Sequence, residues 1–235
     1  MLAPRLVVLA VTGVSLLSFT ACSPVGGAAV QVDGTTYTHA DVDLFTKFEC
    51  SYLAAASADP STGSQVQQIS KAQAQSLMAS ILVTSALDAK VAKHAHVTAD
   101  DAQVASTMTT LTGPIAKVAS GADRTRLTAL ILTSLRAQIA VQTAIIKQIG
   151  EATQQQMGQQ QGSQVLQDTI QSVRTTAAKT ADIRVDPAYG LSANGLRADS
   201  DPSLSVPVSA FAKDSTQTTA PATWLSGLPA NQRCS

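Results

Sequence analysis

Residues 28–43 read AAVQVDGTTYTHADVD, and this stretch predicts how the folded part of the chain begins. Val30 and Val32 flank Gln31 in the alternation of a strand. Asp33-Gly34 is a strong tight-turn dipeptide, and the TTY that follows it suits a second strand. We therefore expect a short β-hairpin.

A helix is predicted directly after this hairpin. Thr38 precedes Asp41 by three residues, which resembles a capping box with Asp in place of the usual Glu. The helix has one apolar face, formed by Val42, Phe45, Tyr52, Leu53 and Ala56. Glu49 lies in the middle of that face. A partner Lys or Arg would account for it; the alternative is that the face borders an open groove.

The rest of the chain predicts a helical body and one more strand. Helices are expected at about 64–95, at 122–149 and at about 163–180. Another helix is expected to begin at a capping box formed by Thr98 and Asp101 and to be interrupted at Gly113-Pro114. A strand is expected at 183–186, followed by a Pro-, Ser- and Thr-rich irregular tail over 192–235, in which Trp224 and Leu225 pack back onto the domain. The predicted fold class is mainly α with a small β element.

Residues 122–149 are apolar enough to raise the possibility of a membrane span. Arg136 lies near the centre of the segment and would cost about 2.5–3.5 kcal/mol there. Thr, Ser and Gln are also scattered through it. A buried core helix is the better interpretation.

The N-terminal residues indicate export. Arg5 precedes an uncharged run from Leu6 to Ala21, which is shorter than the ~20 residues of a membrane-spanning helix and typical of a secretory signal. Phe19-Thr20-Ala21-Cys22 resembles the lipobox of bacterial lipoproteins, although Phe19 stands where Leu is usual. That resemblance implies cleavage after residue 21, a diacylglyceryl group on the Cys22 thiol, and further acylation of the new amino terminus by a fatty acid such as palmitate. An ordinary signal with a chance cysteine is the alternative.

Two acyl chains on Cys22 would give stable attachment, which one chain does not. Residues 22–27 would then be a flexible tether, after a signal peptide over residues 1–21. The expected location is the cell membrane, facing outside the cytoplasm.

Cys50 and Cys234 remain as a pair once Cys22 is lipidated. Export permits a disulfide between them. Closing a loop of about 185 residues would stabilise the fold by roughly 5 kcal/mol at most in the chain-entropy model. Two free thiols are the alternative. A metal site is not expected, because no histidine lies near either cysteine.

Neither the net charge nor the sequence motifs indicate a catalytic function or nucleic-acid binding. The 16 basic and 16 acidic residues balance, and aromatic residues make up 3% of the chain. His94 and His96 are two residues apart, so they point in different directions at a helix end and are not expected to bind a metal. No nucleophile elbow, phosphate loop, HExxH or Cys-x-x-Cys occurs. We expect no catalytic residue, no metal and no cofactor.

Two stretches of the sequence resemble the N-terminal domain of the SurA-like family of extracytoplasmic chaperones. The first is residues 28–43, and the second is ADIRVDPAYG at residues 181–190. The second is similar to the closing strand of actinobacterial members, with Ala188 where they usually have Arg, so no contact of that side chain is implied. With the helices between them, the resemblance spans residues 28–191.

The resemblance implies that the first and last strands pair and that the helices form a cradle for unfolded or extended client segments. Many such proteins also carry a parvulin-type prolyl isomerase domain, but residues 98–180 read as helix throughout and hold no strand of that domain. The expected function is therefore a lipid-anchored, chaperone-like protein that binds non-native or extended polypeptide without isomerase activity. The alternative is an assembly or structural lipoprotein of the envelope that binds one specific folded partner.

Overall fold

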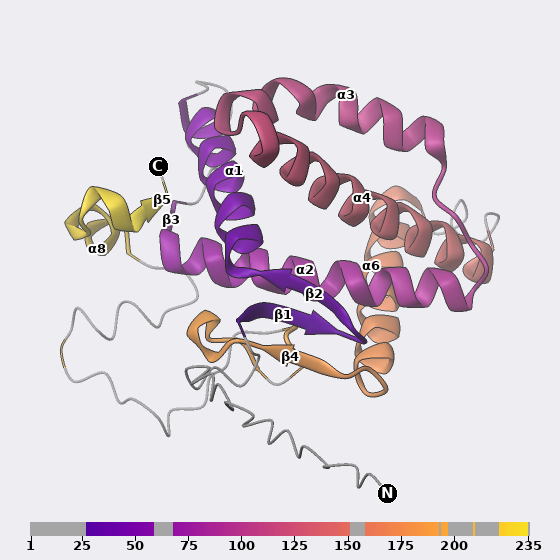
Figure 1. Cartoon of the computed structure of the whole chain (residues 1–235). Coiled ribbons are helices and arrows are strands. Elements are labelled where there is room, and N and C mark those ends of the chain that lie inside the picture. Colours follow the sequence, from indigo (N-terminus) through magenta and orange to yellow (C-terminus); the bar gives the residue numbers. More distant parts are fainter. Residues whose placement is uncertain are drawn as a thin grey trace, which may run out of the picture.

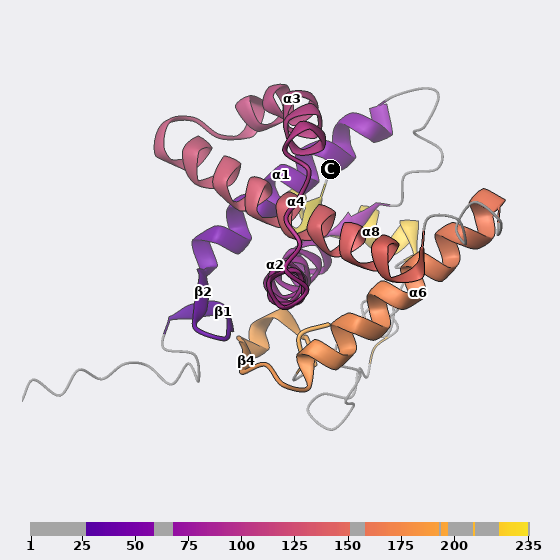
Figure 2. The same cartoon turned by 90° about the vertical axis from the view of Figure 1, so that its right-hand side faces the viewer.

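The computed structural model describes residues 27–58, 68–150, 158–192, 194–196, 209 and 221–234. The fold is mainly helical with a small antiparallel sheet, which confirms the predicted class. The long helices are α1 (His39–Ala58), α2 (Lys71–His94), α3 (Asp101–Val118), α4 (Gly121–Ile149) and α6 (Gly158–Ala178). Helix α2 runs through the middle, between the sheet on one side and α1, α3 and α4 on the other (Figure 1). Seen along α2, helices α1, α4 and α6 surround it (Figure 2).

The sheet joins the two ends of the predicted domain. Strand β1 (Ala28–Val32) lies in the centre and pairs antiparallel with β2 (Thr35–Thr38) and β4 (Ile183–Val185). Val30 of β1 lies opposite Tyr37 on one side and Val185 on the other. The hairpin and the returning strand are both confirmed, and β2 and β4 are the edge strands of this sheet.

The hairpin turn is tied to two other parts of the fold. Asp33 and Gly34 have φ values of 48° and 83°, the left-handed conformation that a two-residue type I′ turn requires. The Asp33 N–H donates to the carbonyl of Asp182 at 3.0 Å, and its side chain accepts from the Asp182 N–H at 2.9 Å. The same carboxylate lies 2.8 Å from Lys90 Nζ of α2. The turn therefore contacts both the approach to β4 and the C-terminal part of α2.

Helix α1 begins at the predicted capping box. The Thr38 N–H donates to Asp41 Oδ2 at 2.8 Å, and the Asp41 N–H donates to Thr38 Oγ1 at 3.2 Å. Asp41 is only 3% exposed. Burial alone would raise the pKa of Asp41, but the hydrogen bonds from Arg126 and Thr38 outweigh it and lower that pKa below its usual range.

Helix α2 starts later than the pattern predicted, because Ser70 caps it. The side chain of Ser70 accepts from the Gln73 N–H at 3.1 Å, and Gln73 Oε1 accepts from the Ser70 N–H at 2.9 Å. This capping box places the first helical residue at Lys71 and leaves Ile69 and Ser70 extended as strand β3. The prediction of a start near residue 64 was therefore wrong.

Helix α3 differs from its prediction at both ends. Asp100, rather than Thr98, caps it by accepting from the N–H groups of Ala102 and Gln103. The predicted interruption at Gly113-Pro114 is wrong, since the helix continues through Pro114 to Val118. Ile115 and Val118 are 2% and 8% exposed. Burying two such side chains contributes about 1.5–3 kcal/mol each, which offsets the ~3 kcal/mol that an internal proline costs.

Helix α4 packs against α1, α2, α3 and α6. Its buried apolar residues include Leu127, Leu130, Ile131, Ile139 and Ile145. By length and composition it is the one helix within the described ranges that could cross a membrane.

Helix α6 is held to α2 by a buried ion pair. Arg174 donates from Nε and Nη2 to the two oxygens of Asp88, at 2.8 and 2.6 Å. Both side chains are withdrawn from solvent, at 14% and 2% exposed. Burial raises the pKa of Asp88, and the hydrogen bonds from Arg174 offset this only in part. Next to the pair, Ile170 of α6 packs with Val141 and Ile145 of α4 in a small second core.

The last residues of the chain are more ordered than predicted. Residues 221–234, part of the tail expected to be irregular, form the short helix α8 (Ala222–Gly227), a 3₁₀ turn and strand β5 (Arg233–Cys234). Trp224, Leu225 and Leu228 are buried together in a cluster of their own. Strand β5 pairs antiparallel with β3, with Cys234 opposite Ile69.

Candidate functional site

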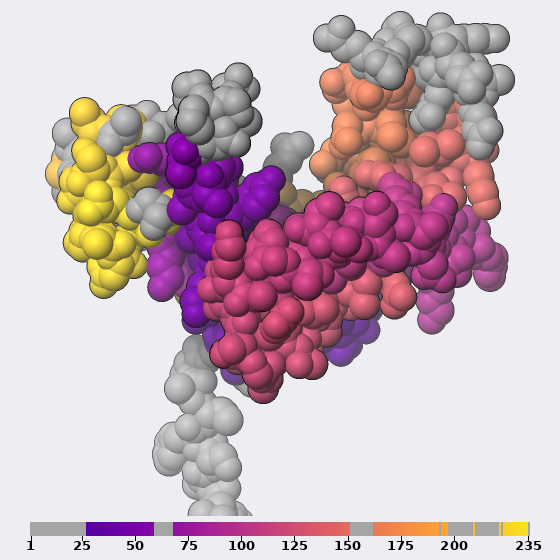
Figure 3. All heavy atoms as spheres, turned by 90° about the horizontal axis from the view of Figure 1, so that it is seen from above, coloured from indigo at the N-terminus to yellow at the C-terminus, as the bar shows by residue number. Residues whose placement is uncertain are grey.

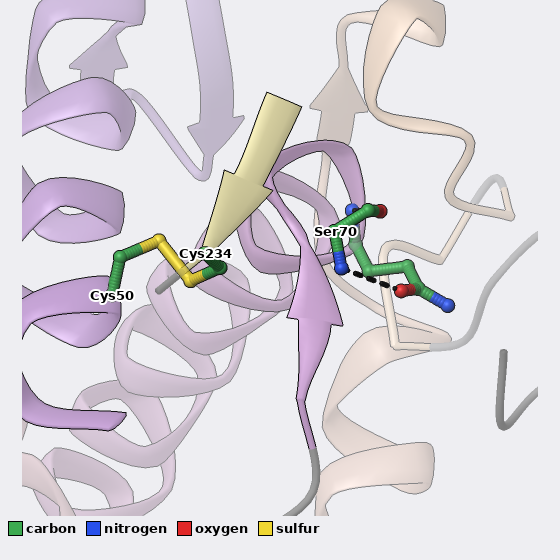
Figure 4. The surroundings of a disulfide bond; sticks show 4 residues. Cys50, Ser70 and Cys234 are labelled. Atoms are coloured by element: carbon green, nitrogen blue, oxygen red, sulfur yellow. Dashed lines mark hydrogen bonds between the residues drawn. A yellow bond between two sulfur atoms is a disulfide. The ribbon is translucent and has the colours of Figure 1, made fainter. Parts of the chain in front are cut away.

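Of the three site residues predicted from the sequence, the structure describes two. Cys22 lies outside the described residues, as do the predicted signal peptide and all of the predicted tether except Gly27. Cys50 and Cys234 are bonded, with their sulfur atoms 2.01 Å apart across 184 positions of sequence. Figure 4 shows the bond reaching from α1 to β5, with Ser70 on the adjoining strand. The disulfide thus fastens residues 221–234 to the body of the domain.

The apolar face of α1 is buried along the first half of the helix and open along the second. Val42 is fully buried and Phe45 is 6% exposed, whereas Tyr52 is 53% exposed. Leu53 and Ala56 are half-buried. Because residues three or four apart share a helix face, these side chains form one stripe that continues beyond the core. We call its second half the open face of α1, comprising Glu49, Tyr52, Leu53 and Ala56.

Glu49 lies half-buried in the open face of α1. The cationic partner that the sequence suggested is not found, since no ion pair or hydrogen bond joins the Glu49 side chain to any residue that the structure describes. Burial raises the pKa of the Glu49 carboxyl above its usual value. The carboxylate is therefore partly withdrawn from water without a described positive charge to stabilise it.

Helix α2 carries the other large apolar side chain that is exposed. Leu77 is 45% exposed, and it and Tyr52 are the large apolar residues exposed within the described ranges. Ile81, four residues after Leu77 on the same side, is half-buried against the core. The exposed apolar surface of the described residues is therefore limited to a few side chains.

The molecule is hollowed on the face seen in Figure 3. The hollow separates α1 and α8 on one side from α6 and the end of α4 on the other. A separate groove of about 460 Å³ lies between α3 and α4. Val104, Met108 and Leu132 provide its apolar wall, and Asp101 and Arg136 form an exposed ion pair of 3.7 Å at its edge.

A polar cluster holds the end of the returning strand against α1. Tyr189 Oη lies 2.8 Å from His39 Nδ1, and His39 Nε2 lies 3.4 Å from Asp186 Oδ2. Asp186 also accepts from the Ala188 N–H, capping the 3₁₀ turn Pro187–Tyr189. Burial, followed by the nearby charges of Asp43 and Asp186, raises the pKa of Tyr189 to about 12. The VDPAYG sequence is thus explained by local structure: a paired strand, a capped turn and a buried tyrosine.

No group of three or more possible metal-ligating side chains occurs in the described part of the chain. His94 and His96 are exposed at the end of α2, as the sequence predicted. No family model, curated protein or solved structure matches this chain. The candidate site therefore rests on the geometry of its own residues.

Sequence reasoning identified the α1 stripe and the unusual position of Glu49 within it. It did not identify Leu77 as exposed, because the spacing of Leu77 in α2 equals that of the buried core residues. It also did not find the groove between α3 and α4. Neither has a local sequence signal, since both depend on which helix covers which face.

Proposed function

We propose that this chain is an exported polypeptide-binding protein that is anchored to the membrane through a lipid on Cys22. It binds extended or non-native segments of other proteins and carries out no isomerase or other catalytic reaction. The observation that carries the proposal is the α1 stripe, which is buried at Val42 and Phe45 and only partly covered from Glu49 to Ala56. A helix face whose apolar pattern continues past its own core offers contact area to another chain.

Two further features support the same proposal. The resemblance of residues 28–43 and 181–190 to the SurA-like family implies a cradle for client segments. Strands β2 and β4 are both edges of the three-stranded sheet, and an edge strand has backbone groups on which an extended peptide can pair. Because Tyr52 and Leu77 are the large exposed apolar side chains described, we expect weak and broad binding.

The test uses the chain from Ser23 onward, which keeps every described element. This protein should slow the aggregation of several unrelated, chemically unfolded proteins when it is present at near-equal molar amounts. Tyr52→Ser and Leu77→Ser should each weaken this effect. Lys47→Ser, an exposed substitution on another face of α1, serves as the matched control. Failure to protect any client would exclude general chaperone-like binding.

The limited apolar surface also favours a second candidate, an envelope assembly or structural protein with one folded partner. A small exposed patch suits one complementary surface as well as it suits many weak clients. Crosslinking in cells followed by purification separates the two. A single stoichiometric partner favours assembly, and many substoichiometric proteins favour a chaperone-like function.

Membrane anchoring is tested separately. Cys22→Ala should move the chain from the membrane fraction to the soluble exported fraction, because the two acyl chains would be lost. Mass spectrometry of the N-terminal peptide should show the added lipid on Cys22. An unmodified Cys22 in a soluble exported protein would support the ordinary signal peptide instead.

A further inference from the structure

On the open face of α1, a carboxylate that pairs with no described residue lies beside an exposed aromatic ring. Tyr52 follows Glu49 by three residues, so the two side chains are neighbours on the helix surface. Leu53 follows Glu49 by four residues and is also a neighbour, and it is half-buried. Glu49, Tyr52 and Leu53 thus combine a negative charge, an aromatic ring and an aliphatic surface within about one helical turn.

The basic residues of the described chain do not neutralise this carboxylate. Each ion pair that the structure describes joins a basic side chain to an aspartate: Asp33, Asp41, Asp88, Asp101, Asp182 and Asp186. Glu49 belongs to none of them, although it is half-buried. A carboxylate that is desolvated without a partner is unfavourable, and a cation supplied from outside would remove that cost.

An exposed tyrosine ring favours the same kind of ligand. A Lys or Arg side chain over the face of an aromatic ring is attracted by the ring quadrupole. The aliphatic stem of Lys or Arg can also lie along an apolar surface while its charged end reaches a carboxylate. Both properties match the surroundings of Glu49.

We propose that the open face of α1 binds polypeptide segments in which a Lys or Arg is flanked by apolar residues, with Glu49 pairing the cation. This inference rests on the proposed function and names its substrate class. Tyr52 contacts the cationic side chain, and Leu53 contacts the apolar flank. The segments selected are therefore amphiphilic and basic rather than purely apolar.

The experiment compares three fluorescent peptides that differ at one central position, Lys, Gln or Glu, between identical apolar flanks. Fluorescence anisotropy gives the affinity of each for the chain from Ser23 onward. We expect the Lys peptide to bind about five- to tenfold more tightly than the Gln peptide, and the Glu peptide to bind most weakly. The preference should shrink as salt is raised, because part of the charge is solvent-accessible.

Glu49→Gln should reduce the Lys-over-Gln preference to less than about twofold, chiefly by weakening the binding of the Lys peptide. Tyr52→Leu should reduce the preference in part. Asp43→Asn is the matched control, because it removes the same charge from an exposed position of α1 that already accepts a hydrogen bond from Gln75. It should keep the preference of the unaltered protein. Urea unfolding should show that all three variants remain folded.

Each outcome has a distinct meaning. Equal binding of the three peptides, or a Lys preference that survives Glu49→Gln, overturns the inference and leaves the proposed function standing. No binding of any peptide by the unaltered protein overturns both. A loss of preference in Asp43→Asn equal to that in Glu49→Gln also overturns the inference, because it reduces the effect to net charge.

Discussion

Asp41 and Arg126 are joined by two hydrogen bonds, of 2.6 and 2.7 Å, across 85 positions of sequence. The same Asp41 carboxylate accepts the Thr38 N–H and so completes the cap of α1. One buried side chain thereby sets where α1 begins and fixes α1 against α4. The open face of α1 depends on this junction, because the junction orients the helix that carries it.

Removing the cation of this pair should destabilise the fold. Arg126→Met leaves Asp41 buried at 3% exposure without its charge partner. We expect a loss of about 2–3 kcal/mol in the free energy of unfolding, less than for a fully buried pair because the Arg126 side chain is 51% exposed. Urea unfolding measures the loss. Arg124→Met, an exposed change on the same helix, should shift stability by less than about 0.5 kcal/mol. Equal effects of the two substitutions would contradict this role.

Acid should narrow the difference in stability between the unaltered protein and Arg126→Met. The folded-state pKa of Asp41 is lowered from its ordinary value of 3.8. Its contribution is therefore fully present above that ordinary value and is lost as the pH falls through the lowered folded-state pKa. The gap between the unfolding free energies of the two proteins should be constant at neutral pH and should begin to narrow below pH 3.8. A gap that stayed constant below that pH as well would assign the loss to packing of the Arg126 side chain.

The Cys50–Cys234 bond should stabilise the last described segment most. Residues 221–234 have their own small cluster around Trp224. They join the domain through the disulfide, the two-residue strand β5 and contacts with α2. Replacing both cysteines by Ala should lower the free energy of unfolding by up to roughly 5 kcal/mol. Amide hydrogen exchange in residues 221–234 should accelerate before that of the main core. Unchanged exchange in this segment would show that its non-covalent contacts hold it without the disulfide.

Substitutions of two leucines of α2 should distinguish effects on the stability of the fold from effects on client binding. Leu82 is fully buried, whereas Leu77 is 45% exposed. Leu82→Ala should cost about 2–5 kcal/mol, and Leu77→Ala should change stability by less than about 0.5 kcal/mol. Thermal or urea unfolding gives both values. Leu77→Ala should nevertheless weaken protection of unfolded clients, so full protection by this variant would remove α2 from the proposed binding surface.

Local signals made several parts of the fold predictable. The Asp33-Gly34 turn and the capping box of Thr38 and Asp41 involve residues within three positions of each other, so their chemistry is visible in the sequence. Ser70 and Gln73 carry an equally local signal, which the prediction of a helix from about residue 64 overlooked. The disulfide between Cys50 and Cys234 could be predicted because the chain has three cysteines and Cys22 was assigned to the lipid, which leaves these two.

By itself, the sequence determined the helical class, the hairpin, the start of α1 and the disulfide pair, because these depend on period, spacing or number. Tertiary structure alone decided that α3 continues through Pro114, since the burial of Ile115 and Val118 outweighs a local preference. It also decided that Asp41 meets Arg126 while Glu49, on the same helix, meets no described cation. Which charge finds a partner depends on how helices distant in sequence pack together, and no local pattern encodes that arrangement.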